Sequence, residues 1–257
     1  YIEFIYNEVQ YYIFKEKFDK AIELLNNHKD KSKFLIILIE LYFNMGNFKQ
    51  GELLLNSIRN EIKKDNNFFN YIGIRSLREG NFEDGWKFYE SRGSKTTSYL
   101  KEIKEWNGEN LEKKKIIVFY EQGIGDTLQF SKYVFCLTKT AKEVVFIVNN
   151  NIKDLFRSDL KNLKIETRDS LKNEEFDYKI SLGSLIKFFY LEKFSSHDYL
   201  INKNIYNNKD WENKLSSNKP NVGLVWTGSF LGPNQPFRSI QLKNLVKILN
   251  LDINFYC

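Results

Sequence analysis

The stretch at residues 115–130, KIIVFYEQGIGDTLQF, most limits what this chain can fold into. A run of β-formers at 116–120 leads through two polar residues into a glycine turn, and an amphipathic run at helical spacing follows. Strand, tight turn and helix are the first half of a βαβ unit. In parallel sheets such a turn lies at the carboxyl end of a strand, where ligands bind, and a helix start favours negative charge. We therefore expect the functional site here.

Strand-like and helical patterns alternate after residue 115. The runs at 116–120, 144–148, 163–166 and 178–182 read as strands, and those at 126–138, 152–156 and 185–191 read as helices. This alternation predicts a Rossmann-like parallel α/β domain over residues 115–205.

A second α/β unit is expected to begin after a polar linker at residues 206–220. Residues 221–257 contain a strand pattern at 222–226, a Gly/Pro loop, a helix pattern near 241–249 and a strand pattern at 253–256. That length is short for an α/β domain. We expect this second domain to be truncated, and the 257-residue chain alone to lack the activity of a complete protein.

Residues 1–92 carry an internal repeat. The segments EKFDKAIELL, GNFKQGELLL and GNFEDGWKFY align, and each has an aromatic residue followed three positions later by a small one: Phe18 and Ala21, Phe48 and Gly51, Phe82 and Gly85. Each segment begins a helical pattern, and another precedes it, at 2–14, 34–45 and 68–77. Three antiparallel helix pairs without strands are predicted, and the spacing resembles tetratricopeptide repeats. The alternative is a generic helical bundle. In either case the aromatic residues should be core.

Residues 93–114 are polar and read as a linker. Asn107-Gly108 marks a turn. The neighbouring Trp106 should fill a hydrophobic seam between modules, the alternative being that it stacks on a ligand.

Composition narrows the function classes. The net charge of +6 permits an anionic partner, but the lysines are scattered and no nucleic-acid motif accompanies them. Cys136 and Cys257 lack metal-ligand spacing, and we expect a reduced, cytoplasmic protein. No apolar run is long enough to span a bilayer, and no signal peptide is recognisable.

The glycine turn fits neither common phosphate-binding motif. Leu128 stands where a dinucleotide fingerprint requires its third glycine, and Gly-Lys-Ser/Thr is absent. What remains is Gly-x-Gly-Asp. Asp126 can be an N-cap, worth about 1 kcal/mol, or a general base at the mouth of the sheet. A helix dipole would keep the base ionised but lower its basicity. The spacing leaves both roles open.

The segment EQGIGDTLQFSKY is similar to the Gly-x-Gly-Asp segment of heptosyltransferase-like, inverting glycosyltransferases of GT-B type. GNFEDGWKFYESR, EWNGENL and VGLVWTGS followed by FRSIQL extend the likeness, which is greatest to the branch with preceding tetratricopeptide repeats. The resemblance implies two Rossmann-like domains facing a cleft, with the acceptor on the first, the sugar nucleotide mainly on the second, and no cofactor or metal.

Carried to this sequence, the resemblance makes Asp126 the catalytic base. The implied substrate-binding residues around it are Gln122, Gly123, Gly125 and Thr127, and the implied donor-binding residues are Thr227, Gly228, Ser229, Asn234 and Arg238. A guanidinium suits the donor diphosphate, because it binds oxygens bidentately. The branch usually carries a His and an Asn-Asp pair between Gly228 and Arg238; here only Asn234 fits, followed by Gln235.

The resemblance implies transfer of a sugar from a nucleotide-sugar donor to a hydroxyl of a glycan, lipid or protein acceptor with inversion, in cell-surface polysaccharide or protein glycosylation. The alternative hypothesis is a tetratricopeptide-repeat module that binds a protein partner and carries an inactive transferase-like domain. A complete second α/β domain with its own Gly-rich nucleotide loop would favour the enzyme.

Overall fold

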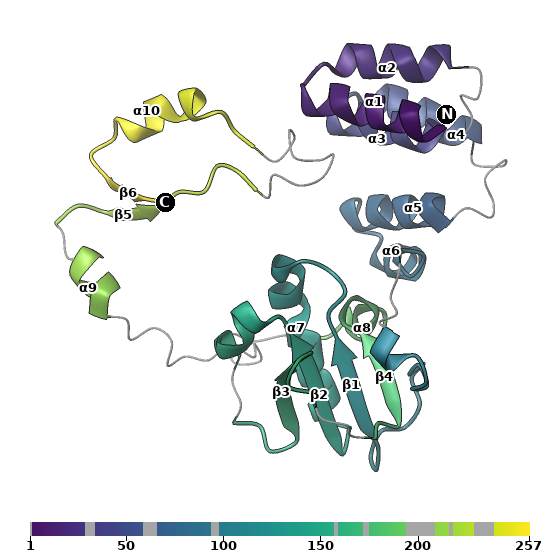
Figure 1. Cartoon of the computed structure of the whole chain (residues 1–257), viewed down its shortest axis with the longest axis vertical. Coiled ribbons are helices and arrows are strands. Elements are labelled where there is room, and N and C mark those ends of the chain that lie inside the picture. Colours follow the sequence, from purple (N-terminus) through teal and green to yellow (C-terminus); the bar gives the residue numbers. More distant parts are fainter. Residues whose placement is uncertain are drawn as a thin grey trace. The chain divides into compact units, whose positions relative to one another are not determined.

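The computed structural model describes residues 2–28, 34–58, 66–93, 98–156, 159–171, 175–193, 209–215, 218–228 and 239–257 (Figure 1). By contacts between residues, 65–207 form one compact unit, and the residues on either side form the other. A helical beginning is followed by a parallel α/β sheet, so the expected fold class is confirmed at that level.

Within the described part of residues 2–93, all regular structure is helical, which confirms the expectation of helices without strands for these residues. The helices are α1 (Ile2–Phe14), α2 (Phe18–Asn27), α3 (Leu35–Asn44), α4 (Phe48–Ile58), α5 (Asn66–Arg78) and α6 (Phe82–Tyr89). Three of them begin at the repeat aromatics Phe18, Phe48 and Phe82.

The small residues of the repeat lie where helices approach closely. Ala21, Gly51 and Gly85 are all buried. A Cβ added to Gly51 would come within 2.7 Å of the Phe43 ring, so a larger side chain needs a shift there.

The repeat aromatics are less buried than predicted. Phe48 and Phe82 are 59% and 52% exposed, so the expectation that they belong to the core is wrong. Both occupy the first position of their helices, before the point at which the small residues Gly51 and Gly85 meet the partner helix.

The α/β part is built on one four-stranded sheet (Figure 1). Its strands are β1 (Lys115–Phe119), β2 (Glu143–Val148), β3 (Leu163–Thr167) and β4 (Tyr178–Ser181), in the order β3-β2-β1-β4 with every pair parallel. Helix α7 (Ile124–Thr138) joins β1 to β2, and α8 (Leu182–Phe189) follows β4. The helix expected at 152–156 is instead a 3-10 helix, Asn150–Leu155.

Both faces of the sheet are covered, which is why its strands read as continuous apolar runs. On one face, strand residues such as Val118 and Phe146 form a core with side chains of α7 and α8, and Trp86 of α6 packs against it. On the other face, Ile117 and Ile147 pack with Leu100. Helix α6 is therefore part of the α/β core, as well as the last helix of the repeat.

The segment at 98–114, expected to be a linker, packs on the α/β unit. The Trp106 N–H donates to the Lys179 carbonyl of β4 at 2.9 Å, which pairs part of a strand edge that would otherwise be open. The Trp106 indole lies in the core, 4.5 Å between ring centroids from Phe188, and donates to the Glu109 carbonyl. It therefore neither fills a seam between modules nor is placed to stack on a ligand.

The described residues after 208 contain α9 (Lys209–Leu215), β5 (Asn221–Gly223), a 3-10 helix at Leu242–Leu245, α10 (Val246–Leu249) and β6 (Asn254–Tyr256). Strands β5 and β6 pair in parallel. The expected strand at 222–226 ends early, at Gly223, and Val225 is 86% exposed. Two short strands bury little apolar surface, and such a pair is marginal by itself.

Candidate functional site

The glycine turn lies at the point where the order of the strands in the sheet reverses. The chain leaves β1 at Phe119 and enters α7 at Ile124, while β2 and β4 flank β1 on its two sides. In open parallel sheets this is the switch point, where a crevice forms outside the carboxyl ends of the strands. The turn therefore follows the carboxyl end of a parallel strand, as the sequence predicted, while its role as the functional site stays a prediction.

The Asp126 side chain caps the start of α7 from a position within the helix. It is the third residue of α7, and its Oδ2 accepts a hydrogen bond from the Gly123 N–H at 3.1 Å. The N-cap itself is Gly123, so the expectation of Asp126 at that position is corrected, although the carboxylate still satisfies a backbone donor. In the described part of the chain its second oxygen, Oδ1, has no hydrogen-bond partner.

The two glycines of the turn differ in the space before their backbone, since a Cβ added at Gly123 would lie 3.3 Å from Asp126 Oδ2. Gly123 is extended, with φ −68° and ψ 171°, a conformation open to any residue. A Cβ added at Gly125 would meet no described atom within 4 Å. Gly123, Ile124 and Gly125 are all exposed. The local fold therefore does not require glycine at Gly125, whereas close approach of a ligand to the backbone would favour it.

The two other predicted substrate-binding residues have internal partners. Thr127 is buried, and its hydroxyl donates to the Gly123 carbonyl at 3.0 Å. The Gln122 side-chain amide donates to the Tyr89 hydroxyl of α6. Both side chains shape the turn in this structure.

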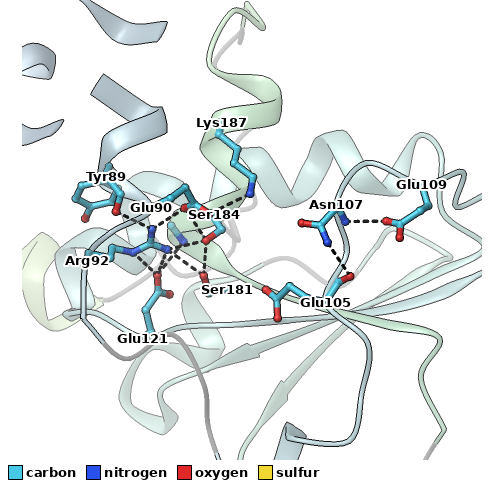
Figure 2. Close-up of polar contacts among 11 residues, drawn as sticks. Tyr89, Glu90, Arg92, Glu105, Asn107, Glu109, Glu121, Ser181, Ser184 and Lys187 are labelled. Carbon is cyan, nitrogen blue, oxygen red and sulfur yellow. Dashed lines mark hydrogen bonds and ion pairs between the residues drawn. The ribbon is translucent and has the colours of Figure 1, made fainter. Parts of the chain in front are cut away.

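A buried ion pair stands directly beside the turn. The side chains of Arg92 and Glu121 are 6% and 7% exposed, and Arg92 Nη2 lies 2.6 Å from Glu121 Oε1. Nη2 also donates to the hydroxyls of Ser181 and Ser184, each at 2.9 Å. Figure 2 shows the guanidinium surrounded by these side chains and by Glu90.

Charges within the cluster hold the guanidinium in its ionised form. Burial alone would lower the pKa of Arg92, but the carboxylates of Glu121 and Glu90 outweigh it and raise that pKa. Glu90 bonds Arg92 Nη1 at 2.8 Å and Lys187 at 2.9 Å. Burial raises the pKa of the neighbouring Tyr89 hydroxyl, which therefore stays protonated at neutral pH.

A polar cavity of about 290 Å³ opens at the same edge of the sheet. It lies at the carboxyl ends of β1, β2 and β3, and its lining residues are Tyr120, Val148, Asn149, Asn150, Asn151, Arg168 and Asp169. Tyr120 connects this cavity to the glycine turn along the chain. Amide, guanidinium and carboxylate groups beside a tyrosine can hydrogen-bond a polyhydroxylated ligand.

Two of the predicted donor-binding residues fall in the described region. Thr227 is half-buried, and its hydroxyl lies 2.9 Å from the Ser239 hydroxyl, while Gly228 is exposed. Ser229, Asn234 and Arg238 lie outside the described residues.

Sequence reasoning missed the Arg92 cluster. Arg92 and Glu121 are 29 residues apart, and although each lies at the end of a segment that carries the family resemblance, no role was assigned to either. The signal that could have found Arg92 is its place in the repeat, where a charged residue stands at a position expected to be buried.

Comparison with known proteins adds no assignment: no protein-family model, curated protein or solved structure matches this chain. Among the described residues, no group of three or more His, Cys, Asp or Glu side chains is placed to hold a metal ion. In the same residues, no helix combines the length and the apolar character needed to cross a bilayer.

Proposed function

We propose that this chain carries the catalytic base of an inverting, GT-B-type glycosyltransferase that uses a nucleotide-sugar donor, with tetratricopeptide-like repeats before it. One observation carries the proposal. Asp126 lies at the open glycine turn of the switch point, with one carboxylate oxygen held by the Gly123 N–H and the other without a described partner. A base needs this combination of a fixed orientation and an available oxygen.

The family resemblance supplies the chemistry of this proposal. Asp126 takes the proton of an acceptor hydroxyl as the hydroxyl oxygen attacks the anomeric carbon of the donor. The bond from that carbon to the diphosphate breaks, so the nucleoside diphosphate leaves and the configuration inverts. The polar cavity beside Tyr120 supplies partners for the acceptor, and the exposed turn at Gly125 lets it approach the backbone.

The donor would be bound by the segment after β5. The family resemblance suggests Thr227, Gly228, Ser229, Asn234 and Arg238 for this role, and the guanidinium suits a diphosphate. The glycan, lipid or protein nature of the acceptor is a further part of the proposal, to be found by screening.

The test is Asp126→Asn in the full-length gene product. Turnover is measured as nucleoside diphosphate released from a panel of UDP-, GDP-, ADP- and dTDP-sugars with mixed sugar acceptors. Loss of the base should lower turnover by about 10²-fold or more. The amide can still accept from the Gly123 N–H, so the free energy of unfolding, measured with urea, should change by only a few tenths of a kcal/mol, whereas Asp126→Ala should cost about 1 kcal/mol.

Asp177→Asn is the matched control. It removes a carboxylate that pairs with Lys114. Asp177 stands just before β4, at the end of the sheet opposite to the glycine turn, so the change should leave turnover unchanged. If Asp126→Asn keeps near-normal turnover while Asp126→Ala loses stability, Asp126 is only a cap and the base lies elsewhere.

A second candidate is a helical module that binds a protein partner and carries an inactive transferase-like domain. The observation that favours it is the set of exposed aromatic side chains on α1, at Phe4, Tyr11 and Phe14. Absence of turnover and of binding for every donor in the panel would favour this candidate over the enzyme.

A further inference from the structure

Two side chains at the end of the last repeat helix hydrogen-bond two consecutive residues of the segment that leads into the glycine turn. Arg92, just past the end of α6, bonds Glu121 through Nε and Nη2, at 3.1 and 2.6 Å. Tyr89, the last residue of α6, accepts a hydrogen bond from Gln122. The next residue, Gly123, is in turn bonded to Asp126. A chain of direct contacts therefore runs from α6 to the proposed base.

Stability alone does not explain a charged pair here. A buried ion pair often contributes no more than apolar residues of the same volume, because desolvation offsets the attraction. What an arginine adds is geometry, since its planar fork fixes several acceptors at once. Arg92 bonds Glu121, Ser181 and Ser184 and thus joins the ends of β1 and β4 and the start of α8 (Figure 2).

The start of α8 is shaped around the same pair. A Cβ added at Gly183 would lie 2.7 Å from Glu121 Oε1 and 2.9 Å from Arg92 Nη2. Any larger residue at this position would therefore displace the ion pair. The Gly183 N–H also donates to Glu121 Oε1 at 3.3 Å. The pair therefore occupies the space between the end of β1 and the start of α8. The polar cavity lies on the other side of β1, toward β2, and offers room there for a ligand of the turn.

We propose that Arg92 is a positioning residue, which fixes the Glu121–Gln122 segment and through it the glycine turn. The last helix pair of the repeat is then part of the site, and it acts through contacts on one side of the turn while substrate enters on the other. The effect on turnover rests on the proposed function, but the positioning itself does not.

The experiment measures amide hydrogen exchange of the full chain by mass spectrometry in peptides covering residues 121–127. Arg92→Lys keeps the positive charge and loses the fork. It should speed exchange in these peptides by about tenfold or more, because losing hydrogen bonds makes local opening easier. Peptides covering β2 and β3 should exchange as in the unaltered chain. Arg75→Lys, at a half-buried residue paired with Glu79 on α5, is the matched control and should change neither region.

A second variant keeps the test decisive if Arg92→Lys does not fold. Tyr89→Phe removes only the hydroxyl that Gln122 bonds, and should speed exchange in the same peptides by about threefold. Unchanged exchange at 121–127 in the folded variants overturns the positioning role.

Turnover provides the second readout. If the chain's gene product is a transferase, Arg92→Lys should lower kcat by about tenfold with KM little changed, since the base is displaced and the ligand contacts are kept. Faster exchange with no transferase activity in any variant would reject the proposed function and keep the positioning. Faster exchange with unaltered kcat would show that the turn's position does not matter for turnover, and that result overturns the link to catalysis.

Discussion

Helix pairs α3–α4 and α5–α6 share one repeat sequence and differ in what they pack against. At the offset of 34 residues that separates Phe48 from Phe82, Ile58 of α4 corresponds to Arg92, and Leu55 to Tyr89. Ile58 and Arg92 are both buried, one as an apolar side chain and the other in the charged cluster beside the glycine turn. The repeat sequence therefore determines the helix pair, while the residues at the end of the second helix determine what that pair packs against.

The two pairs also differ in how closely their helices approach. At the same offset, the buried Ile39 of α3 corresponds to Gly73 of α5. A Cβ added at Gly73 would lie 2.6 Å from the Tyr89 backbone nitrogen, so α5 and α6 touch backbone to backbone. This close contact is at the end of α6 that leads to Arg92.

The largest expected effect comes from truncating the repeat at two points, before and after its third helix pair. A chain beginning at residue 65 keeps Trp86 and Arg92 and should fold its α/β unit. One beginning at residue 94 should lose about 3–5 kcal/mol of unfolding free energy, because Glu121 is left buried without its partner. Urea unfolding of the two chains measures the difference.

Equal urea midpoints for the two chains would show that the stability of the sheet does not depend on the third helix pair. Glu121→Gln is the control, since it removes the unpaired charge and should restore part of the loss in the shorter chain.

Matched glycine substitutions should give a smaller contrast. Gly73→Ala forces a methyl group against backbone and should destabilise by about 2 kcal/mol or more, even though alanine favours helix by about 1 kcal/mol. For Gly51→Ala the nearest atoms belong to the Phe43 ring and not to backbone, so its net effect should be within about 1 kcal/mol of zero. Thermal or urea unfolding of both variants gives the values. A larger loss for Gly51→Ala would reverse the assignment of the tighter pair.

Periodicity predicted the elements because burial repeats with the helix or strand. The starts of α2, α4 and α6 at Phe18, Phe48 and Phe82 followed from the aligned repeat, and the four strands followed from their apolar runs. The parallel order with β4 beside β1 could not be predicted in the same way, because it depends on contacts between distant strands.

The site was only partly predictable, for two physical reasons. The glycine turn is local, so its place at a strand end was evident, but the helix begins two residues before Asp126 and makes it a third-position residue. The Arg92–Glu121 pair is polar and buried, and apolar patterns contain no signal for such a pair. Residues 98–114 similarly lack a period, because their order comes from covering the β4 edge.

The smallest expected effect concerns the turn that starts the second helix of each pair. Gly46 and Gly80 have φ of +77° and +81° there, while the corresponding Glu16 has φ +56°. A left-handed conformation costs a residue with a Cβ about 1–2 kcal/mol, and glycine loses about 0.4–1 kcal/mol through its freer unfolded state. Glu16→Gly should therefore stabilise the first pair by about 0.5–1 kcal/mol, seen as a higher urea midpoint. Gly46→Ala and Gly80→Ala should each lower it, because a Cβ at these positions finds no clash but a strained φ. A lower midpoint for Glu16→Gly would mean that the Glu16 side chain contributes more to the first pair than its backbone strain costs, and that the three turns are not equivalent.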